Sequence, residues 1–463
     1  MIADLKPYSE YQQPGLPWAE RVPAHWKLRR TKVLFSQRVQ KGFPDEPLLA
    51  ATQSQGVVKK SDYGERTVTA TKDLHLLKLV EPGDFVISLR SFQGGLEIAH
   101  CRGIISPAYT ILKPRDEVRR GYFKRFFKSP DFIDSLTLFV TGIREGQNID
   151  YERLSRVYLP VPPPDEQEAI GRFLDHWNGR LEKAIRSKRR VIALLQEQKQ
   201  AIIHRAVTRG LDPTVKLKDS GIPWLGEIPE HWEVRKIKSL VSTKGGMTPN
   251  KGVQRYWVGQ TPWVSPKDMK VPEIFDSRDH ISESALKETN IGLIPPHSVL
   301  IVVRGMILAR TFPTSVTRVP VTINQDMKAL IPRPELSADY FASLLIGIKS
   351  DLLQLVELAG HGTCCLRTDA WGNFYLPLPP IDEQEAITNT LKGELSTLTT
   401  AITRFEREIT LLREYRTRLT ADVVTGKLDV RAAAAQLPEQ AEDEPLPDPE
   451  LPEEETELEE VEA

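Results

Sequence analysis

The sequence predicts a mixed α/β (α+β) protein in which two different α/β domains are separated by two long helices that form an antiparallel coiled coil. The chain contains an internal repeat, each half ends in a long helix-forming segment, and each interior alternates short apolar runs with turn residues. The expected boundaries are 1–158 for the first domain, 159–213 for the first helix, 214–376 for the second domain, 377–431 for the second helix and 432–463 for an acidic disordered tail. A repeated frame implies approximate two-fold symmetry within the chain.

The repeat lies in the segments that flank each interior. Residues 22–30 (VPAHWKLRR) return at 228–236 (IPEHWEVRK), a shift of 206, and residues 158–170 return at 375–387, a shift of 217. The interiors between these segments show little resemblance to each other. A repeated frame around two interiors of different sequence is typical of a molecule that recognises two different ligands with one geometry.

The second flanking segment of each half is predicted to begin a helix. A proline-rich run comes first, and prolines favour extended backbone in the residues before them. Asp165 is then expected to cap the helix, with Glu168 completing a capping box, and Asp382 and Glu385 repeat this spacing. Acidic side chains in a first helical turn also interact favourably with the helix dipole, so capping is a better interpretation than an acidic catalytic cluster.

After each cap, steps alternating between four and three residues mark an apolar stripe with a 3.5-residue period, the signature of a coiled coil. The coiled-coil residues predicted are Ile170, Leu174, Trp177, Leu181, Val191, Leu195 and Ile202 in the first helix, and Ile387, Leu391, Leu398, Phe405, Leu412 and Leu419 in the second. The polar residues Lys188 and Glu408 occupy the same register. Pairing of the two helices within one chain is expected; packing of each helix on its own domain, or dimerisation of two chains, are the alternatives.

Each interior is predicted to be a mixed α/β domain. Strands are expected at residues 48–52, 84–90 and 108–112 of the first interior, followed by helices at 122–127 and 132–138. The second interior has expected strands at 298–305 and 328–331 and an expected helix at 340–357.

Composition points to a polyanionic partner. The formal net charge is −1, but residues 438–463 hold 13 Asp or Glu and no Lys or Arg, so residues 1–437 carry +12. A basic folded part suits nucleic acid, and the acidic segment is too polar to fold alone. Three cysteines, two of them adjacent, make no disulfide framework. With no long apolar run and no signal-peptide pattern, a cytoplasmic protein with no membrane association is expected.

No motif for catalysis is found in the sequence. The P-loop pattern G-x-x-x-x-G-K-[ST] is absent, as are a G-x-G-x-x-G after a strand and an Asn-Pro-Pro-Tyr tetrapeptide. His361 near Cys364 and Cys365 matches no usual metal-ligand spacing. The expectation is therefore no catalytic residue, no metal and no cofactor in this chain.

Several segments resemble the Type I restriction–modification enzyme specificity subunits. Residues 221–232 (GIPWLGEIPEHW) and 378–384 (LPPIDEQ) are similar to the shared regions of that family, and residues 49–58, 261–268 (TPWVSPKD) and 324–326 (NQD) are similar to motifs inside its target-recognition domains. The resemblance covers nearly the whole chain except the acidic tail. Each motif alone is weak, and their order and duplication carry the assignment.

The resemblance implies a non-catalytic subunit that binds double-stranded DNA and reads a bipartite target, one half-site per domain, with the paired helices spacing the half-sites. It also implies two methyltransferase subunits and two motor-nuclease subunits as partners, with S-adenosylmethionine, ATP and Mg²⁺ on those partners. The whole complex would methylate adenine at N6 and restrict unmethylated DNA.

Arg, Asn and Gln read base edges, while Lys, Arg, Ser and Thr bind phosphates. The DNA-binding residues predicted at strand ends and loops are Arg90, Ser91, Gln93, Ser106, Tyr109, Arg144, Gln147 and Asn148 in the first domain, and Lys267, Arg304, Asn324, Gln325, His361, Thr363 and Arg367 in the second. Trp26 and Trp232, in the repeated frame, are predicted to be core anchors.

Two rival functions remain open from the residues alone. A single-chain nuclease or methyltransferase with a sparse active site would cut or methylate DNA by itself. An adaptor whose coiled coil only bridges proteins would lack DNA affinity and its steep salt dependence.

Overall fold

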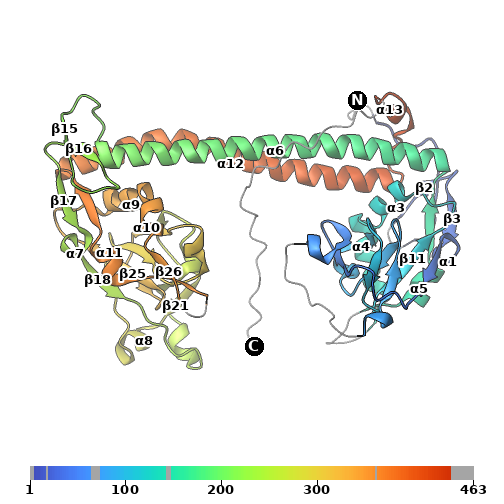
Figure 1. Ribbon diagram of the computed structural model, residues 1–463, viewed down its shortest axis with the longest axis horizontal. Coiled ribbons are helices and arrows are strands. Elements are labelled where there is room, and N and C mark those ends of the chain that lie inside the picture. Colours follow the sequence, from blue (N-terminus) through green and yellow to red (C-terminus); the bar gives the residue numbers. More distant parts are fainter. Residues whose placement is uncertain (1–4, 17–18, 64–72, 142–147, 360–361, 439–463) are drawn as a thin grey trace. The chain divides into compact units, whose positions relative to one another are not determined.

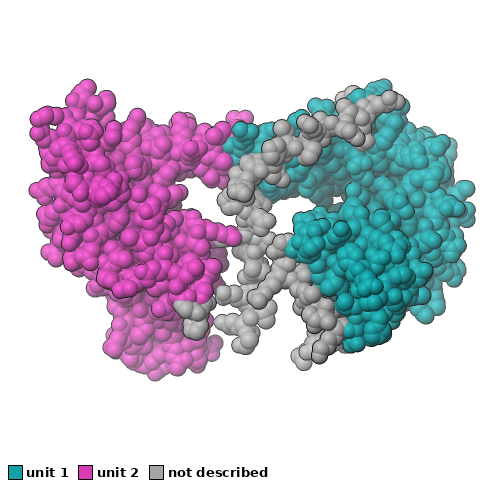
Figure 2. All heavy atoms as spheres, in the orientation of Figure 1, with its two compact units in different colours: residues 1–190, 407–463 teal, residues 191–406 magenta. Residues whose placement is uncertain are grey.

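The computed structural model describes residues 5–16, 19–63, 73–141, 148–359 and 362–438. The described chain divides into two compact units (Figures 1 and 2). Unit 1 holds residues up to 190 together with the stretch from 407 onward, and unit 2 holds residues 191–406. Each unit therefore contains one α/β domain and one part of each long helix.

Two long helices, α6 (Pro164–Arg209) and α12 (Ile381–Val424), lie antiparallel, as the repeat predicted (Figure 1). In unit 1, Leu419, Val423 and Val424 of α12 share a core with Ile170 and Leu174 of α6. Arg416 and Glu182 form an ion pair of 2.8 Å, and Lys188 pairs with Glu408. Lys188 and Glu408, two polar residues of the predicted stripe, thus bind each other.

Unit 2 repeats this packing with the helix ends exchanged. Ile203 and Val207 near the end of α6 share a core with Ile387 and Leu391 near the start of α12. Lys199 Nζ donates to Thr399 Oγ1 at 3.1 Å. Pairing of the helices within one chain is therefore confirmed.

The buried stripe of the helices departs from the predicted one at some positions. Val191 is 38% exposed and is not part of the packed stripe. In the middle of the helices the deeply buried positions are Ile185, Ile402 and Ile409, each one residue past a position of the predicted register. Along α12 the less exposed residues from Leu395 to Leu419 alternate steps of three and four residues, so the stripe keeps the heptad spacing of a coiled coil. Ile170, Leu174, Ile387, Leu391 and Leu419 are buried, and the other seven predicted members are half-buried.

The helix starts also differ from the prediction. α6 begins at Pro164, so Asp165 lies inside the first turn, and the Pro163 carbonyl accepts from the backbone N–H groups of Glu166 and Gln167 at 3.0 and 2.9 Å. Proline suits this first position because it has no N–H to satisfy. Glu168 pairs with Arg119 at 2.8 Å instead of closing a capping box.

The α/β domain of unit 1 is built on a four-stranded antiparallel sheet. Its strands, in order across the sheet, are β4 (Phe35–Arg38), β11 (Thr110–Pro114), β8 (Phe85–Ile87) and β9 (Glu97–Ile98). Helices α3 (Arg120–Phe126) and α4 (Pro130–Leu136) supply Phe123, Phe126 and Phe132 to the core, as expected. The predicted strand at 48–52 is β5 (Leu49–Thr52), which pairs with β6 (Gly56–Lys59).

The α/β domain of unit 2 has the same strand order extended by one strand. The strands are β18 (Val241–Gly245), β25 (Met327–Pro332), β22 (Val299–Val302), β23 (Thr314–Thr317) and β20 (Glu273–Ile274). A second, three-stranded sheet has β19 (Thr261–Val264) between β21 (Asp279–Ile281) and β24 (Thr322–Ile323). Both interiors are thus mixed α/β and share one topology.

The repeated frame forms matching two-stranded ladders. β3 (Lys27–Arg30) pairs with β14 (Tyr158–Val161), and β17 (Glu233–Lys236) pairs with β28 (Tyr375–Leu378). Tyr158 lies opposite Arg30 and Tyr375 opposite Lys236, so the two ladders keep the same register after the sequence shifts of 217 and 206.

Two expected boundaries are wrong. The helix predicted at 340–357 is divided into α9 (Ala338–Gly347) and α10 (Lys349–Leu353), and strand β26 (Val356–Leu358) follows. The first helix ends at a glycine because Gly347 lies against α6, where a Cβ would come within 2.8 Å of Val207. Residues 432–435, where the tail was predicted to begin, lie in α13 (Arg431–Ala435), which buries Ala433 and Ala434. No helix among the described residues is long and apolar enough to span a membrane.

Candidate nucleic-acid interface

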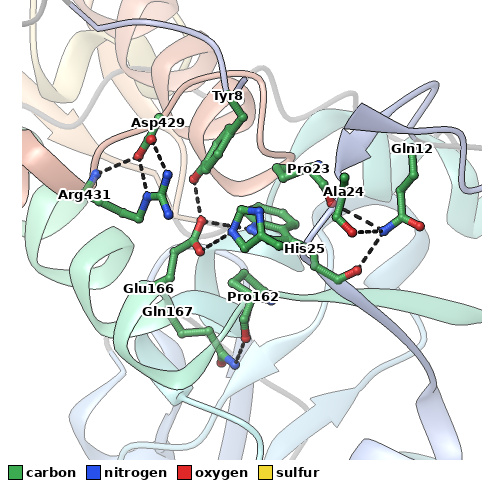
Figure 3. Close-up of polar contacts among 11 residues, drawn as sticks. Tyr8, Gln12, Pro23, Ala24, His25, Pro162, Glu166, Gln167, Asp429 and Arg431 are labelled. Carbon is green, nitrogen blue, oxygen red and sulfur yellow. Dashed lines mark hydrogen bonds and ion pairs between the residues drawn. The ribbon is translucent and has the colours of Figure 1, made fainter. Parts of the chain in front are cut away.

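A buried carboxylate fixes the start of α6 to the first domain (Figure 3). Glu166, whose side chain is 4% exposed, accepts hydrogen bonds from the Tyr8 hydroxyl at 2.6 Å and from Trp26 Nε1 at 2.9 Å. His25 Nε2 lies 2.7 Å from the other carboxylate oxygen. Burial and the bond to Glu166 raise the pKa of Tyr8 far above its ordinary value, so this hydroxyl stays protonated and donates.

The same arrangement recurs at the start of α12. Glu383 accepts from Trp232 Nε1 at 3.0 Å and lies 2.8 Å from His231 Nε2. Trp26 and Trp232 are buried in the two cores, which confirms them as core anchors. The Asp-Glu-Gln motif, residues 165–167 and 382–384, therefore holds each long helix to the domain that precedes it.

The glutamine of that motif attaches each helix to a second segment of the same domain. Gln167 is fully buried; its Nε2 donates to the carbonyls of Glu117 and Pro162, and its Oε1 accepts from Arg119 N, at 2.9–3.0 Å. Gln384, equally buried, makes the three corresponding bonds to Glu335 O, Pro379 O and Ser337 N at 2.8–2.9 Å. Each amide has its polar atoms satisfied, as a buried amide requires.

A buried tyrosine in each domain bonds the carboxyl end of the other long helix. Tyr122 of α3 donates to Val424 O at 2.9 Å, and Tyr340 of α9 donates to Val207 O at 3.3 Å. Burial raises the pKa of both hydroxyls well above the ordinary value. In each unit, one domain therefore holds the start of one helix and the end of the other.

With the domains fixed this way, strand ends form a polar edge in unit 2. Parallel strands β19 and β24 end side by side, Val264 opposite Ile323, and Lys267 and the turn at residues 324–327 follow them. Arg304 comes two residues after β22, and its backbone N–H donates to the Asp326 carbonyl at 3.3 Å. Lys267, Arg304 and Gln325 are exposed there.

The turn at this edge is internally braced. Asn324, buried, accepts from the backbone N–H of Asp326 at 3.1 Å through its side chain, and its carbonyl accepts from Met327 N at 3.3 Å. The Gln325 amide bonds Thr248 and lies 3.4 Å from Asp326. Gly246 lies against the Asn324 carbonyl, where a Cβ would come within 1.9 Å.

Unit 1 has a corresponding edge. Arg90, exposed, comes three residues after β8 and immediately before the short helix α2 (Ser91–Gly94). The turn at residues 106–109 precedes β11: the Ser106 hydroxyl accepts from Ala108 N at 3.3 Å and the Ser106 carbonyl from Tyr109 N at 3.1 Å.

Comparison with known proteins finds matches to one family. Residues 229–411 match the Type I restriction modification DNA specificity domain. The Escherichia coli Type I restriction enzyme EcoR124I/EcoR124II specificity subunit is 31% identical over 268 residues, 56% of this chain and 60% of that protein. Over the matched residues the chain is similar to Type I restriction–modification specificity subunits.

A second relative and one solved structure are also similar to this chain. The MjaIX specificity subunit of Methanocaldococcus jannaschii is 30% identical over 171 residues, 36% of this chain and 38% of its own length. The matched stretch thus spans less than two thirds of either of these two relatives. A chain from a structure of complex assembly and conformational transition of the type I R-M system has the same fold, with a TM-score of 0.60 and 16% identity over 88% of this chain and 99% of that one.

Not every predicted DNA-binding residue is available to a ligand. Ser91 is buried, and its hydroxyl accepts from Ser88 N at 2.8 Å, so it braces the loop after β8; this prediction is wrong. Asn324 braces its turn in the same way. Arg367 is exposed, but both ends of its guanidinium are bound by Asp369 at 2.8 and 3.2 Å at the start of α11 (Thr368–Gly372).

The remaining predicted DNA-binding residues differ in exposure and in whether the structure describes them. Gln93 is exposed on α2, while Tyr109 and Thr363 are half-buried. Arg144, Gln147 and His361 lie outside the described residues, and Asn148 is described only in its backbone, at the start of β13 (Asn148–Ile149). In the described part of the chain, no group of three or more His, Cys, Asp or Glu is placed to hold a metal ion.

The sequence prediction missed how far the internal repeat extends. Glu117, Arg119 and Tyr122 occupy the places of Glu335, Ser337 and Tyr340, a shift of 218. The signal is present in the sequence as Pro114-Arg115 and Tyr122-Phe123 against Pro332-Arg333 and Tyr340-Phe341. These pairs were hidden because three intervening loops differ in length between the halves.

Proposed function

We propose that this chain is the DNA-reading subunit of a Type I restriction–modification enzyme, with each α/β domain recognising one half of a bipartite target. One observation carries the proposal: two domains of one topology, joined by one repeated set of contacts to a pair of helices, end in polar edges of different composition. A duplicated frame keeps the geometry of recognition constant, while different edge residues permit different bases to be read.

The repeated glutamates support a structural rather than a catalytic role for the frame. Glu166, which is buried, and Glu383, which is half-buried, are each bound by a tryptophan and a histidine of the same unit, so both carboxylates of the motif are engaged in holding helices. We propose that catalysis belongs to partner subunits: two methyltransferase subunits that use S-adenosylmethionine, and two motor-nuclease subunits that use ATP and Mg²⁺. A cytoplasmic location follows from such a function.

The test is modification of DNA by the reconstituted complex. The chain is produced with the methyltransferase subunit of its own operon, and methylated adenines are mapped on a genome that lacks other methylation. We expect a single split motif of two short half-sites around an unread spacer, and no methylation by either protein alone. Methylation at a continuous motif, or none with the partner, contradicts the proposal; cleavage or methylation by this chain alone favours the single-chain enzyme.

A further inference from the structure

The two polar edges correspond residue by residue, and this correspondence comes from the strand register rather than from sequence similarity. In unit 1, Pro114 lies opposite Phe35 and Leu112 opposite Phe85. In unit 2, Pro332 lies opposite Val241 and Leu330 opposite Val299. The sheets therefore superimpose with Phe85 on Val299, and the position five residues further along is an arginine in both units: Arg90 and Arg304.

The neighbouring turns agree with this register. Counting back from Leu112 and Leu330 places Ser106 on Asn324, and both residues close the same turn with a side-chain oxygen that accepts from the backbone N–H two residues later. The carbonyls of Ser106 and Asn324 also accept from the residue three positions later, at 3.1 and 3.3 Å. Each arginine precedes a short helical segment, α2 in unit 1 and η6 (Met306–Ala309) in unit 2.

Both arginines are free to bind a ligand. Each is exposed, and neither guanidinium forms a hydrogen bond or ion pair with any residue that the structure describes. This distinguishes them from Arg367, which Asp369 binds at both ends, and from Arg318, which Glu273 and Asp339 hold within unit 2. The planar fork of arginine matches the two acceptors that guanine presents in the major groove.

We propose that Arg90 and Arg304 are equivalent specificity-determining residues, each contacting a base of its own half-site from the same place on its domain. This inference rests on the proposed function, because it needs one half-site per domain. The residues between the turn ends differ, Pro107-Ala108 in unit 1 against Gln325-Asp326 in unit 2, and they provide a physical reason why the two half-sites are not the same sequence.

The register also supplies matched controls. Arg115 and Arg333 follow the far ends of β11 and β25, and their backbone N–H groups donate to Leu34 O and Leu240 O, both at 2.9 Å. Both side chains are exposed, so their removal changes the charge as much as removal of the reading arginines. A strand of five or six residues at about 3.3 Å each separates them from the polar edge by roughly 15–20 Å.

The experiment measures methylation by the complete methyltransferase complex on a library in which every base pair of both half-sites is varied. For Arg90→Ala we expect discrimination at one base pair of the first half-site to fall by about 5- to 150-fold, with the second half-site unchanged; Arg304→Ala should do the reverse. Arg115→Ala and Arg333→Ala should leave both half-sites as they are. Circular dichroism and complex formation confirm that each variant is folded.

Three outcomes overturn the inference. Uniform weakening across all sequences identifies phosphate contacts, unchanged discrimination excludes a contact, and loss in both half-sites from one variant refutes the assignment of one arginine to each. These outcomes leave the proposed function intact as long as the unmodified chain directs methylation to a split motif. If that chain directs none, it is the proposed function that fails.

Discussion

Glu166 shows how one side chain joins three distant parts of unit 1. It lies in the first turn of α6 and receives hydrogen bonds from Tyr8 and Trp26 of the amino-terminal segment. Arg431, just after α12, lies over the Tyr8 ring at 5.2 Å and is held by Asp429. Removing the carboxylate leaves a buried hydroxyl and a buried indole N–H without their acceptor, which is costly in a site closed to water.

We therefore expect Glu166→Ala to lower the free energy of unfolding of unit 1 by about 2–4 kcal/mol, since each orphaned buried donor costs about 1–3 kcal/mol. Urea unfolding followed by near-ultraviolet circular dichroism measures this. Glu383→Ala is the matched control: Glu383 is 27% exposed and water can replace its lost bonds, so a smaller effect is expected. Equal losses in both variants would show that burial is not the cause.

Sequence reasoning identified the motif around Glu166 but not what its residues do. A Glu-Gln pair after a proline run is enough to predict where a helix begins, because capping and the backbone geometry of proline depend only on neighbouring residues. The partners of Glu166 are 140 and 158 residues away, and no local pattern reports contacts over such separations. The exposed arginines were predicted to bind DNA from their residue type alone. The same criterion also gave Ser91, whose hydroxyl lies inside a loop.

At the scale of the helices, the packed face differs from the predicted one at alternate positions of the stripe. The predicted register places Glu394 and Glu408 on the stripe, whereas the structure buries Ile402 and Ile409, each one residue past a predicted position. The heptad spacing itself is kept, because Ile402 and Ile409 are seven residues apart. The prediction succeeded near the helix ends, where it was anchored by the caps, and failed for Val191 near the middle.

This difference between the predicted and the observed stripe has a measurable consequence for stability. Ile409 is 5% exposed and Leu411, two residues later on α12, is 54% exposed. We expect Ile409→Ala to lower the free energy of unfolding by about 2–4 kcal/mol, as for other buried aliphatic truncations, and Leu411→Ala to change it by less than about 0.5 kcal/mol. Thermal and urea unfolding of the two variants, side by side, measure these losses; a larger loss at Leu411 than at Ile409 would contradict the packed face that the structure gives to α12.

For the molecule as a whole, α6 and α12 are the segments that belong to both units. If the helices set the separation of two half-sites, then lengthening both by four residues, after Arg190 and after Glu406, adds about 6 Å of helix. With about 3.4 Å per base pair, the unread spacer should grow by one or two base pairs. Mapping of methylated adenines in a host that carries the variant measures the new spacer.

The control inserts the same four residues into the connection after α6, at residues 211–216, which leaves both helix lengths unchanged. Its motif should be that of the unmodified chain. An unchanged spacer in the doubly lengthened variant, with methylation still present, would show that the helices do not set the separation.

The contact between Lys6 and Asp429 has a consequence for the order in which the two units are completed during synthesis. Asp429 N donates to Lys6 O at 2.8 Å, and the Tyr11 hydroxyl bonds Lys427 O, so unit 1 is closed by residues from both ends of the sequence. Unit 2 is one uninterrupted stretch. On the ribosome, where amino-terminal segments emerge first, the domain translated first is thus completed last. A ribosome that stops between residues 406 and 427 releases a chain with unit 2 complete and unit 1 still open.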